Sequence, residues 1–194
     1  VSGSHFHGIS CWNSPSSALG LSIDSVIFVE TQDFNLDFIP QIRETLRTSD
    51  HRYESYFGTA RGVENTIQVL FDASSGAEWL TKCAGCGLWV EPTQEKHALS
   101  MIQRHGVACP DCSRLLDFEA GKWVHRNPDR SEDREDEPGF AGYHIPATVI
   151  RDLVTPHDRY IDTIYNKLHG PPGIRYSEAK FLQEVLGLSS DQGG

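Results

Sequence analysis

The sequence IDSVIFVETQDF, residues 23–34, carries the pattern that decides the fold class. Its centre is an apolar run, VIFV at residues 26–29, which ends at the acidic residue Glu30. A short apolar run that is bounded by polar residues is typical of a buried strand. The stretch therefore predicts a buried strand whose C-terminal end presents a carboxylate.

The residues that follow indicate a parallel sheet. Apolar residues recur at helical spacing between residues 36 and 46, with Asp37 as the expected N-cap and Pro40 in the first turn. A second strand-like run occupies residues 53–57. A strand, a helix and a second strand in this order form a βαβ unit, so we expect an α/β fold.

Further elements are expected downstream. The sequence GTARGV, residues 58–63, leads into a helix with one apolar face. The sequence GFAGYHIPA, residues 139–147, has the character of another strand. Two helices should follow, one across residues 161–168 and one from an N-cap at Ser177 to Gly187.

Charge and hydropathy limit the classes of function. The chain has 194 residues and a net charge of −10, which argues against strong non-specific binding of DNA by the chain as a whole. No segment approaches the roughly 20 apolar residues of a membrane span, and no signal peptide is recognisable. We therefore expect a cytoplasmic protein that has no membrane partner.

Four of the five cysteines form two CxxC pairs, Cys83 with Cys86 and Cys109 with Cys112. Each CxxC turn brings two sulfur atoms to the spacing of ligands around one tetrahedral ion. Gly87 and Ser113, directly after the pairs, suit tight turns with positive φ. Because four thiolates leave no open coordination position, the pattern predicts a structural zinc. A redox dithiol and metal-free buried cysteines remain alternatives.

Composition predicts four parts in the chain. A partial α/β core is expected in residues 1–77 and 139–170, with a zinc ribbon inserted at residues 78–125. Residues 126–138 form an acidic loop, and residues 171–194 form a C-terminal linker helix and tail. We expect Trp89 and Trp123 to pack around the metal, with stacking on nucleic acid as the alternative role.

The parts of a nucleotide site are incomplete. Phosphate-handling α/β enzymes use a glycine-rich loop ending in Gly-Lys-Ser/Thr, a strand-end acid that holds magnesium, and a group that activates water. No GxxxxGK[ST] sequence occurs in the chain. On the residues alone, a plain strand followed by an acid is therefore the simpler interpretation of residues 23–34.

Longer motifs resemble a known family. The sequence SPSSALGLSIDSVIFVETQDFNLDFIPQIRETL at residues 14–46, followed by GTARGVENTIQVLFDASSGAEWLTKCAGCGLW at residues 58–89, is similar to the large terminase subunit of tailed phages. That protein is an ATP-driven DNA-packaging motor. GYHIPA at residues 142–147 and FLQEVLGL at residues 181–188 resemble its last motor strand and its linker toward the nuclease domain.

The resemblance implies a partial parallel-sheet core like that of P-loop ATPases, with an inserted zinc-ribbon module. It places Glu30 on the catalytic Glu that activates water, if the site is active. It places Gly58 and Thr59 on the coupling motif, and makes Thr59 and Asp33 the candidates for contact with the nucleotide and its metal. The four cysteines Cys83, Cys86, Cys109 and Cys112 match the zinc-binding insertion.

Three positions depart from the family pattern. Val29 stands where an Asp holds magnesium, Ala60 replaces a usual Pro, and Leu19 replaces a frequent Arg. With no phosphate loop, binding of ATP and magnesium in the manner of an active motor is not expected. The sequence thus predicts a fragment or a degenerate derivative of viral or prophage origin in a host cytoplasm, without ATPase or nuclease activity of its own.

Such a derivative would act by binding partners. The family context names other terminase or portal components and double-stranded DNA, and it is compatible with an oligomer. Two alternatives stay open. The chain is part of an active motor whose phosphate loop is supplied elsewhere, or it is a stand-alone zinc-ribbon adaptor.

Overall fold

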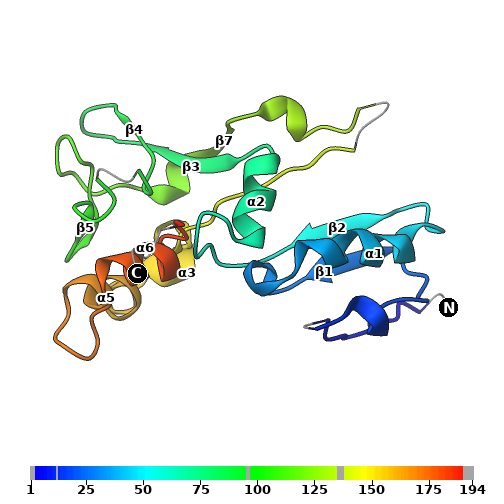
Figure 1. Cartoon of the computed structure of the whole chain (residues 1–194). Coiled ribbons are helices and arrows are strands. Elements are labelled where there is room, and N and C mark those ends of the chain that lie inside the picture. The colour runs from blue at the N-terminus through cyan, green and yellow to red at the C-terminus, as the bar shows by residue number, and fades with distance from the viewer. Residues whose placement is uncertain (1–2, 12, 95–96, 135–137, 190–194) are drawn as a thin grey trace. The chain divides into compact units, whose positions relative to one another are not determined.

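The structure is a computed structural model that describes residues 3–11, 13–94, 97–134 and 138–189. The chain divides into two compact units, residues 1–59 and residues 60–194. Each unit is described by itself, and Figure 1 shows the elements of both. The finer division into four parts stays a prediction.

The first unit contains a βαβ arrangement. Strands β1 (Ser25–Phe28) and β2 (Tyr53–Tyr56) pair in parallel, with Ser25 opposite Tyr53 and Phe28 opposite Tyr56. Between them lie the 3-10 helix η2 (Thr31–Asp33), the 3-10 helix η3 (Leu36–Phe38), the helix α1 (Ile39–Arg43) and the 3-10 helix η4 (Glu44–Leu46). A further 3-10 helix, η1 (Pro15–Ser17), precedes β1. The predicted strand–helix–strand order is confirmed.

The start of the helical segment differs from the prediction. Asn35, and not Asp37, caps η3, because the Asn35 side chain accepts a hydrogen bond from the Asp37 backbone N–H at 2.9 Å. Pro40 lies in the first turn of α1. The first backbone N–H groups of a helix have no partner within it, so a proline there removes no helical hydrogen bond. Residues 36–46 thus form two short 3-10 helices, η3 and η4, on either side of the short helix α1, and not one regular helix.

Strand β1 is only half buried, which corrects the expectation of a fully buried strand. Phe28 is buried and stacks on Tyr56 with 4.8 Å between ring centroids. Ile27 is 53% exposed, and Val29, which follows the strand, is 66% exposed. The side chains of successive strand residues point to opposite faces, so a two-stranded sheet packed on one face buries only alternate residues.

The second unit begins with helix α2 (Thr66–Ala73) and a three-stranded antiparallel sheet in the order β4-β3-β7. These strands are β3 (Ala77–Lys82), β4 (Trp89–Val90) and β7 (Gly121–His125). A small hairpin, β5 (Ile102–Gln103) with β6 (Gly106–Val107), and the 3-10 helix η5 (Phe118–Ala120) lie between β4 and β7. The 3-10 helix η6 (Pro128–Arg130) follows β7.

The predicted strand at residues 139–147 is wrong. Only Tyr143 forms a β-bridge, to Ala77, flanked by hydrogen bonds from Ala77 N to Gly142 O at 2.7 Å and from His144 N to Ala77 O at 3.0 Å. Pro146 has no N–H with which to continue a ladder. The segment therefore touches the edge of the sheet at one point and then turns into the helical region.

The C-terminal part is helical, as predicted. It comprises the 3-10 helix η7 (Ala147–Val149), α3 (Arg151–Val154), α4 (His157–Tyr160), the π-helical turn η8 (Ile161–Tyr165), α5 (Asn166–His169) and α6 (Glu178–Glu184). The Ser177 side chain caps α6 by accepting from Lys180 N at 3.3 Å. Gly187 has a φ of 66°, which lets the chain leave the helix in a left-handed turn.

The cysteine region and the C-terminal helices share one core. Its buried cluster joins Cys83, Met101, Val107 and Cys109 to Tyr160, Ile164, Phe181 and Leu186, among others. Hydrogen bonds tie the same parts, because Tyr160 Oη donates to Gln103 O at 2.8 Å and His169 Nε2 lies 3.0 Å from Ile102 O. The cysteine region is therefore packed as part of a larger unit.

The fold is mixed α/β with small sheets. In the described residues these sheets number three, of which only the β1-β2 sheet is parallel. The larger parallel sheet of a P-loop ATPase core is not among them. Over the same described ranges, none of the helices combines the length and apolar character that a membrane crossing requires.

Candidate functional site

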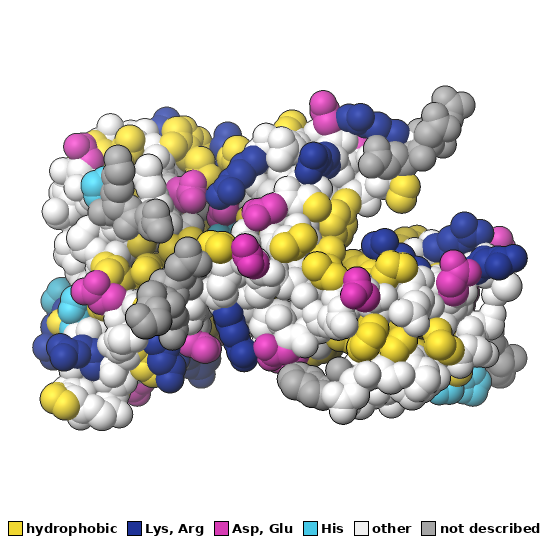
Figure 2. All heavy atoms as spheres, viewed as in Figure 1, with side chains coloured by type: hydrophobic (Ala, Val, Ile, Leu, Met, Phe, Trp, Pro, Cys, Tyr) yellow, Lys and Arg dark blue, Asp and Glu magenta, His cyan; other side chains and the backbone are white. Residues whose placement is uncertain are grey.

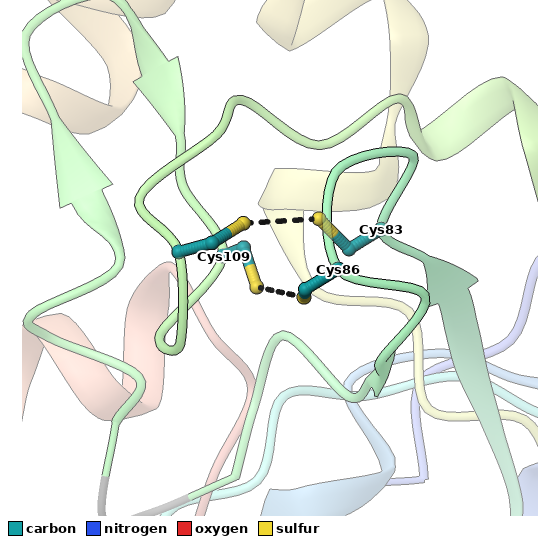
Figure 3. A group of neighbouring side chains, drawn as sticks. Cys83, Cys86 and Cys109 are labelled. Carbon is teal, nitrogen blue, oxygen red and sulfur yellow. Dashed lines mark hydrogen bonds between the residues drawn. The ribbon is translucent and has the colours of Figure 1, made fainter.

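The four cysteines of the two CxxC pairs come together at one point. Their sulfur atoms all lie within 4.8 Å of one another, with Cys83 Sγ 3.5 Å from Cys112 Sγ and Cys86 Sγ 3.7 Å from Cys109 Sγ. Figure 3 shows the sulfurs of Cys83, Cys86 and Cys109 turned toward a common centre. Tetrahedral zinc with bonds of about 2.3 Å to sulfur needs sulfurs about 3.8 Å apart. The four cysteines are therefore positioned to bind a metal ion such as zinc.

The two turns that present the sulfurs have the same backbone pattern. Cys83 N donates to Leu88 O and Cys109 N donates to Arg114 O, each at 2.8 Å. Inside these loops, Gly87 N donates to Cys83 O and Ser113 N donates to Cys109 O, each at 2.9 Å.

The left-handed backbone that the sequence predicts after each pair is present. Gly87 has a φ of 79° and Ser113 has a φ of 60°. Glycine adopts this conformation without steric cost, whereas serine does so with some strain. The spacing of the cysteines thus predicted both the cluster and its supporting turns.

Backbone N–H groups act on three of the four sulfurs, and each of these hydrogen bonds lowers the pKa of the thiol that accepts it. The N–H groups of Cys86 and Gly85 point at the Cys83 sulfur and lower the pKa of this thiol to about 6. The Leu88 N–H lowers the pKa of Cys86, but burial and the neighbouring sulfurs outweigh it and raise this pKa to about 12. For Cys112, contacts with Cys83 and burial outweigh the Arg114 N–H, so its pKa is raised.

Four thiolate sulfurs at these distances would repel one another. A bound metal ion supplies the positive charge that four close thiolates need, and its binding releases protons. Cys83 and Cys109 are buried, while Cys86 and Cys112 reach the surface. With four sulfur ligands the shell of a tetrahedral ion is complete, so the chemistry of this donor set is structural.

The two tryptophans do not surround the cysteines as expected. Trp123 contacts Trp79 and Tyr143 edge to face, each with 5.1 Å between ring centroids. Trp89 is 43% exposed, and Lys122 Nζ lies 4.5 Å from the centre of its ring. The buried cluster that contains Cys83 and Cys109 holds no tryptophan; its members include Val90, Met101, Val107, Tyr160 and Phe181.

The second candidate site lies where β1 and β2 end. Glu30 has a left-handed backbone with a φ of 55°, and its Oε2 accepts from Gln32 Nε2 at 2.6 Å. The Gln32 Oε1 accepts from Thr59 N at 3.0 Å. The hydroxyl of Thr31 donates to Phe57 O at 2.9 Å. A buried amide therefore joins the predicted catalytic acid to the predicted coupling motif.

Gln32 is the functional candidate that sequence reasoning missed. It belongs to the quoted stretch, but its bonding partner Thr59 is 27 residues away, so no local pattern revealed it. Asp33 is exposed in η2, and its backbone N–H donates to Glu30 O at 3.1 Å. Throughout the described ranges, the cysteine cluster is the one group of three or more close His, Cys, Asp or Glu ligand atoms. Glu30 and Asp33 thus do not complete a second one.

We expect Gly58→Ala to break the Gln32 link. A Cβ at residue 58 would collide with Gln32 Oε1 and lie 3.1 Å from the Gln32 backbone N. Such overpacking, together with loss of the bond to Thr59 N, should cost about 2 kcal/mol in the free energy of unfolding. Urea denaturation measures this value. Gly8→Ala is the control, since no atom lies within 4 Å of its added Cβ, and equal effects of the two variants would contradict the prediction.

Comparison with known proteins yields no relative. No protein-family model, no curated protein and no solved structure shows significant similarity to the chain. The terminase resemblance therefore rests on the quoted motifs alone. The metal centre rests on the positions of the four sulfur atoms.

Proposed function

We propose that the chain is a terminase-like binding module that a structural zinc ion stabilises, with neither ATPase nor nuclease activity of its own. In this proposal it belongs to a viral or prophage DNA-packaging context in a host cytoplasm. Its partners would be other terminase or portal components, or double-stranded DNA. The motif order supports the terminase context, and the cysteine cluster supports the zinc.

The environment of Glu30 carries the non-catalytic part of the proposal. Magnesium prefers carboxylate and other oxygen ligands, but the adjacent position holds the exposed apolar side chain of Val29. One oxygen of Glu30 is already bonded to Gln32 at 2.6 Å. The carboxylate is thus held within the unit, and among the residues that the structure describes it belongs to no group of three or more close ligand atoms.

Charge favours a protein partner over DNA. The net charge is −10, and on the face shown in Figure 2 acidic and basic side chains are interspersed over the described residues. Binding of a DNA duplex depends on neutralising several phosphates with Lys and Arg. An adaptor that contacts protein components needs no such patch, and the stand-alone adaptor remains a variant of the same proposal.

One observation favours the alternative of an active motor part. Two hydrogen bonds through the Gln32 side chain join Glu30 to Thr59 N. In an active motor, Glu30 would activate water for hydrolysis, and Thr59 would belong to the motif that couples hydrolysis to DNA movement. Glu30 also holds a strained backbone, and strain of this kind is common at functional sites. In this alternative, the phosphate loop comes from another chain or segment.

ATP turnover separates the two candidates. The zinc-loaded chain, alone or mixed with a terminase fragment that bears a phosphate loop, is expected to release no more phosphate than the fragment alone. Glu30→Gln should leave this result unchanged, and Glu44→Gln, an exposed acid, is the matched control. Turnover that appears on mixing and disappears only with Glu30→Gln would overturn the non-catalytic proposal.

A further inference from the structure

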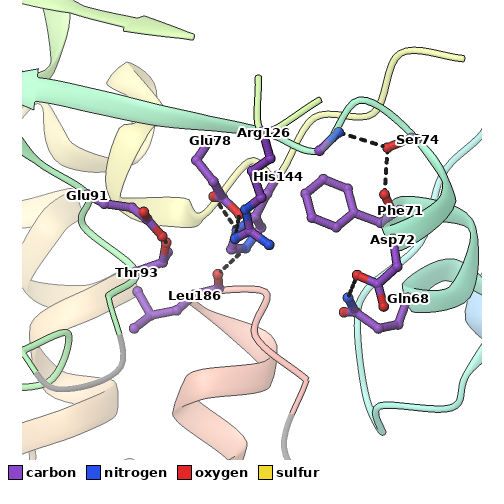
Figure 4. A network of polar contacts seen from close by, with 11 residues as sticks. Gln68, Phe71, Asp72, Ser74, Glu78, Glu91, Thr93, Arg126, His144 and Leu186 are labelled. Atoms are coloured by element: carbon purple, nitrogen blue, oxygen red, sulfur yellow. Dashed lines mark hydrogen bonds and ion pairs between the residues drawn. The ribbon is translucent and has the colours of Figure 1, made fainter. Parts of the chain in front are cut away.

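A group of charges around a buried carboxylate lies between β3 and the end of α6, outside both candidate sites. Glu78 of β3 is 5% exposed, and its two carboxylate oxygens take separate partners. Arg126 Nη2 donates to Oε1 at 2.8 Å, and His144 Nδ1 lies 2.8 Å from Oε2. Figure 4 shows these side chains converging, with Leu186 at the far side of the His144 ring.

The two contacts of His144 decide its protonation state. Besides Nδ1 at the carboxylate of Glu78, its Nε2 lies 2.7 Å from Leu186 O. The carbonyl of Leu186 can only accept, and the carboxylate of Glu78, which is also paired with Arg126, accepts as well. A neutral imidazole carries only one N–H. Its other ring nitrogen would then point a lone pair at the lone pair of an oxygen, either of Glu78 or of Leu186. Only the imidazolium ion donates to both, and this geometry therefore requires a charged His144.

The contact with Leu186 closes the end of α6. Gly187 N donates to Gln183 O at 3.1 Å, which is the bond of an αL cap, and Leu188 N donates to Leu182 O at 2.9 Å. The Leu186 carbonyl is one of the last groups of the helix without a partner inside it. A cation at a helix C-terminus also interacts favourably with the helix dipole.

The position after Leu186 leaves room for the ring of His144. A Cβ at Gly187 would lie 2.9 Å from His144 Nε2, so only glycine fits beside the imidazole without a shift. The positive φ of Gly187 therefore serves both the cap and the close approach of His144.

The surrounding charges are consistent with a cation at His144. Burial alone lowers the pKa of His144, but the hydrogen bond and charge of Glu78 and the bond to Leu186 O outweigh it, so the pKa is raised. Burial and the negative charge of Glu78 raise the pKa of Glu91, whose carboxylate also accepts from Thr93 Oγ1 at 3.3 Å. From α2, the uncharged ring of Phe71 meets the imidazole edge at 6.1 Å between centroids.

We propose that His144 is a charged latch that fastens the end of α6 to strand β3, and that loss of its proton opens this end of the helix. The latch joins three segments that are distant in sequence, namely β3, the segment after residue 139 and the C-terminal turn of α6. It is a conformational device of the second unit and does not depend on the function proposed above.

The pH dependence has a definite sign. A histidine whose pKa is higher in the closed form than in the open form stabilises the closed form fully below the ordinary value of about 6.5. This stabilisation is lost as the pH rises through the raised pKa. Between the two pKa values, the population of the open form should grow about tenfold per pH unit, and below pH 6 it should stay constant.

Hydrogen exchange of the zinc-loaded full chain tests the latch. After correction for intrinsic exchange, amides of residues 182–188 should exchange up to about tenfold faster per pH unit above neutrality in the wild type. His144→Gln should remove this dependence and exchange quickly at all pH values, while His97→Gln, an exposed histidine, should behave like the wild type. Equal slopes in the wild type and His144→Gln would overturn the proposal.

Two further measurements keep the test decisive if His144→Gln folds poorly. Glu78→Gln retains the shape of the side chain but removes the charge, so it should move the opening to lower pH. Nitrogen-15 NMR of the wild type at pH 6.5 should show protons on both ring nitrogens of His144. A single protonated nitrogen there, with both contacts intact, would contradict the latch.

Discussion

Removal of the metal from the zinc-loaded chain is expected to unfold the C-terminal helices together with the cysteine region. The reason is the shared core, in which Cys83 and Cys109 are buried in one cluster with Phe181, Val185 and Leu186. Binding of a structural zinc contributes directly to folding free energy, so a chelator should reduce hydrogen-exchange protection in residues 83–116 and 157–186 by about a hundredfold or more. Mass spectrometry with peptide resolution measures both regions in one experiment.

Cysteine variants provide the matched comparison. Cys109→Ser removes a buried ligand and should reproduce the effect of the chelator, whereas Cys11→Ser lies outside the cluster and should not. The purified wild type should contain about one equivalent of zinc, and a content below about half an equivalent would refute the zinc assignment. Loss of protection confined to residues 83–116 would instead show that the cysteine region folds independently of the helices.

Gly121→Ala should strongly destabilise the β4-β3-β7 sheet. A Cβ at Gly121 would overlap the indole ring of Trp79, which covers this glycine at the start of β7. Trp79 is held in place by its Nε1 bond to Phe118 O at 3.2 Å and by its edge contact with Trp123. Displacing such a ring should lower the free energy of unfolding by about 3 kcal/mol. Urea denaturation of the zinc-loaded protein measures the change.

The control for this substitution is Gly62→Ala in the same unit. An added Cβ at Gly62 meets no heavy atom within 4 Å, so its effect should stay below about 1 kcal/mol. Near-ultraviolet circular dichroism should also change for Gly121→Ala, because the Trp79–Trp123 pair is disturbed. Identical denaturation midpoints for the two variants would show that Trp79 moves aside without cost.

The sequence predicted those features that are determined by residues close together in the chain. The CxxC spacing determines where two sulfurs lie, and the residues after each pair determine the turn, so the cluster and the positive φ of Gly87 and Ser113 were both foreseen. The cap at Ser177 and the stop at Gly187 are local in the same way. The parallel pairing of β1 and β2 followed from the helical crossover expected between them.

The parts that the sequence did not predict depend on distant partners. The segment at residues 139–147 has strand-like composition, but it finds only Ala77 to pair with. Gln32 gains a role only through Thr59. Glu78 occupies a strand position where an acid is normally exposed, and its burial became visible only once Arg126 and His144 were seen beside it.

The shared core also sets an order of events when the chain is synthesised. The last of the four sulfur ligands, Cys112, leaves the ribosome well before the helix α6 that completes the same core. A metal ion can therefore be captured while Met101, Ile102 and Val107 still lack their helical cover. In that interval the nascent chain exposes an apolar surface, which is the state most open to aggregation and to chaperones. The core of this unit is therefore complete only after its C-terminal helix has been synthesised.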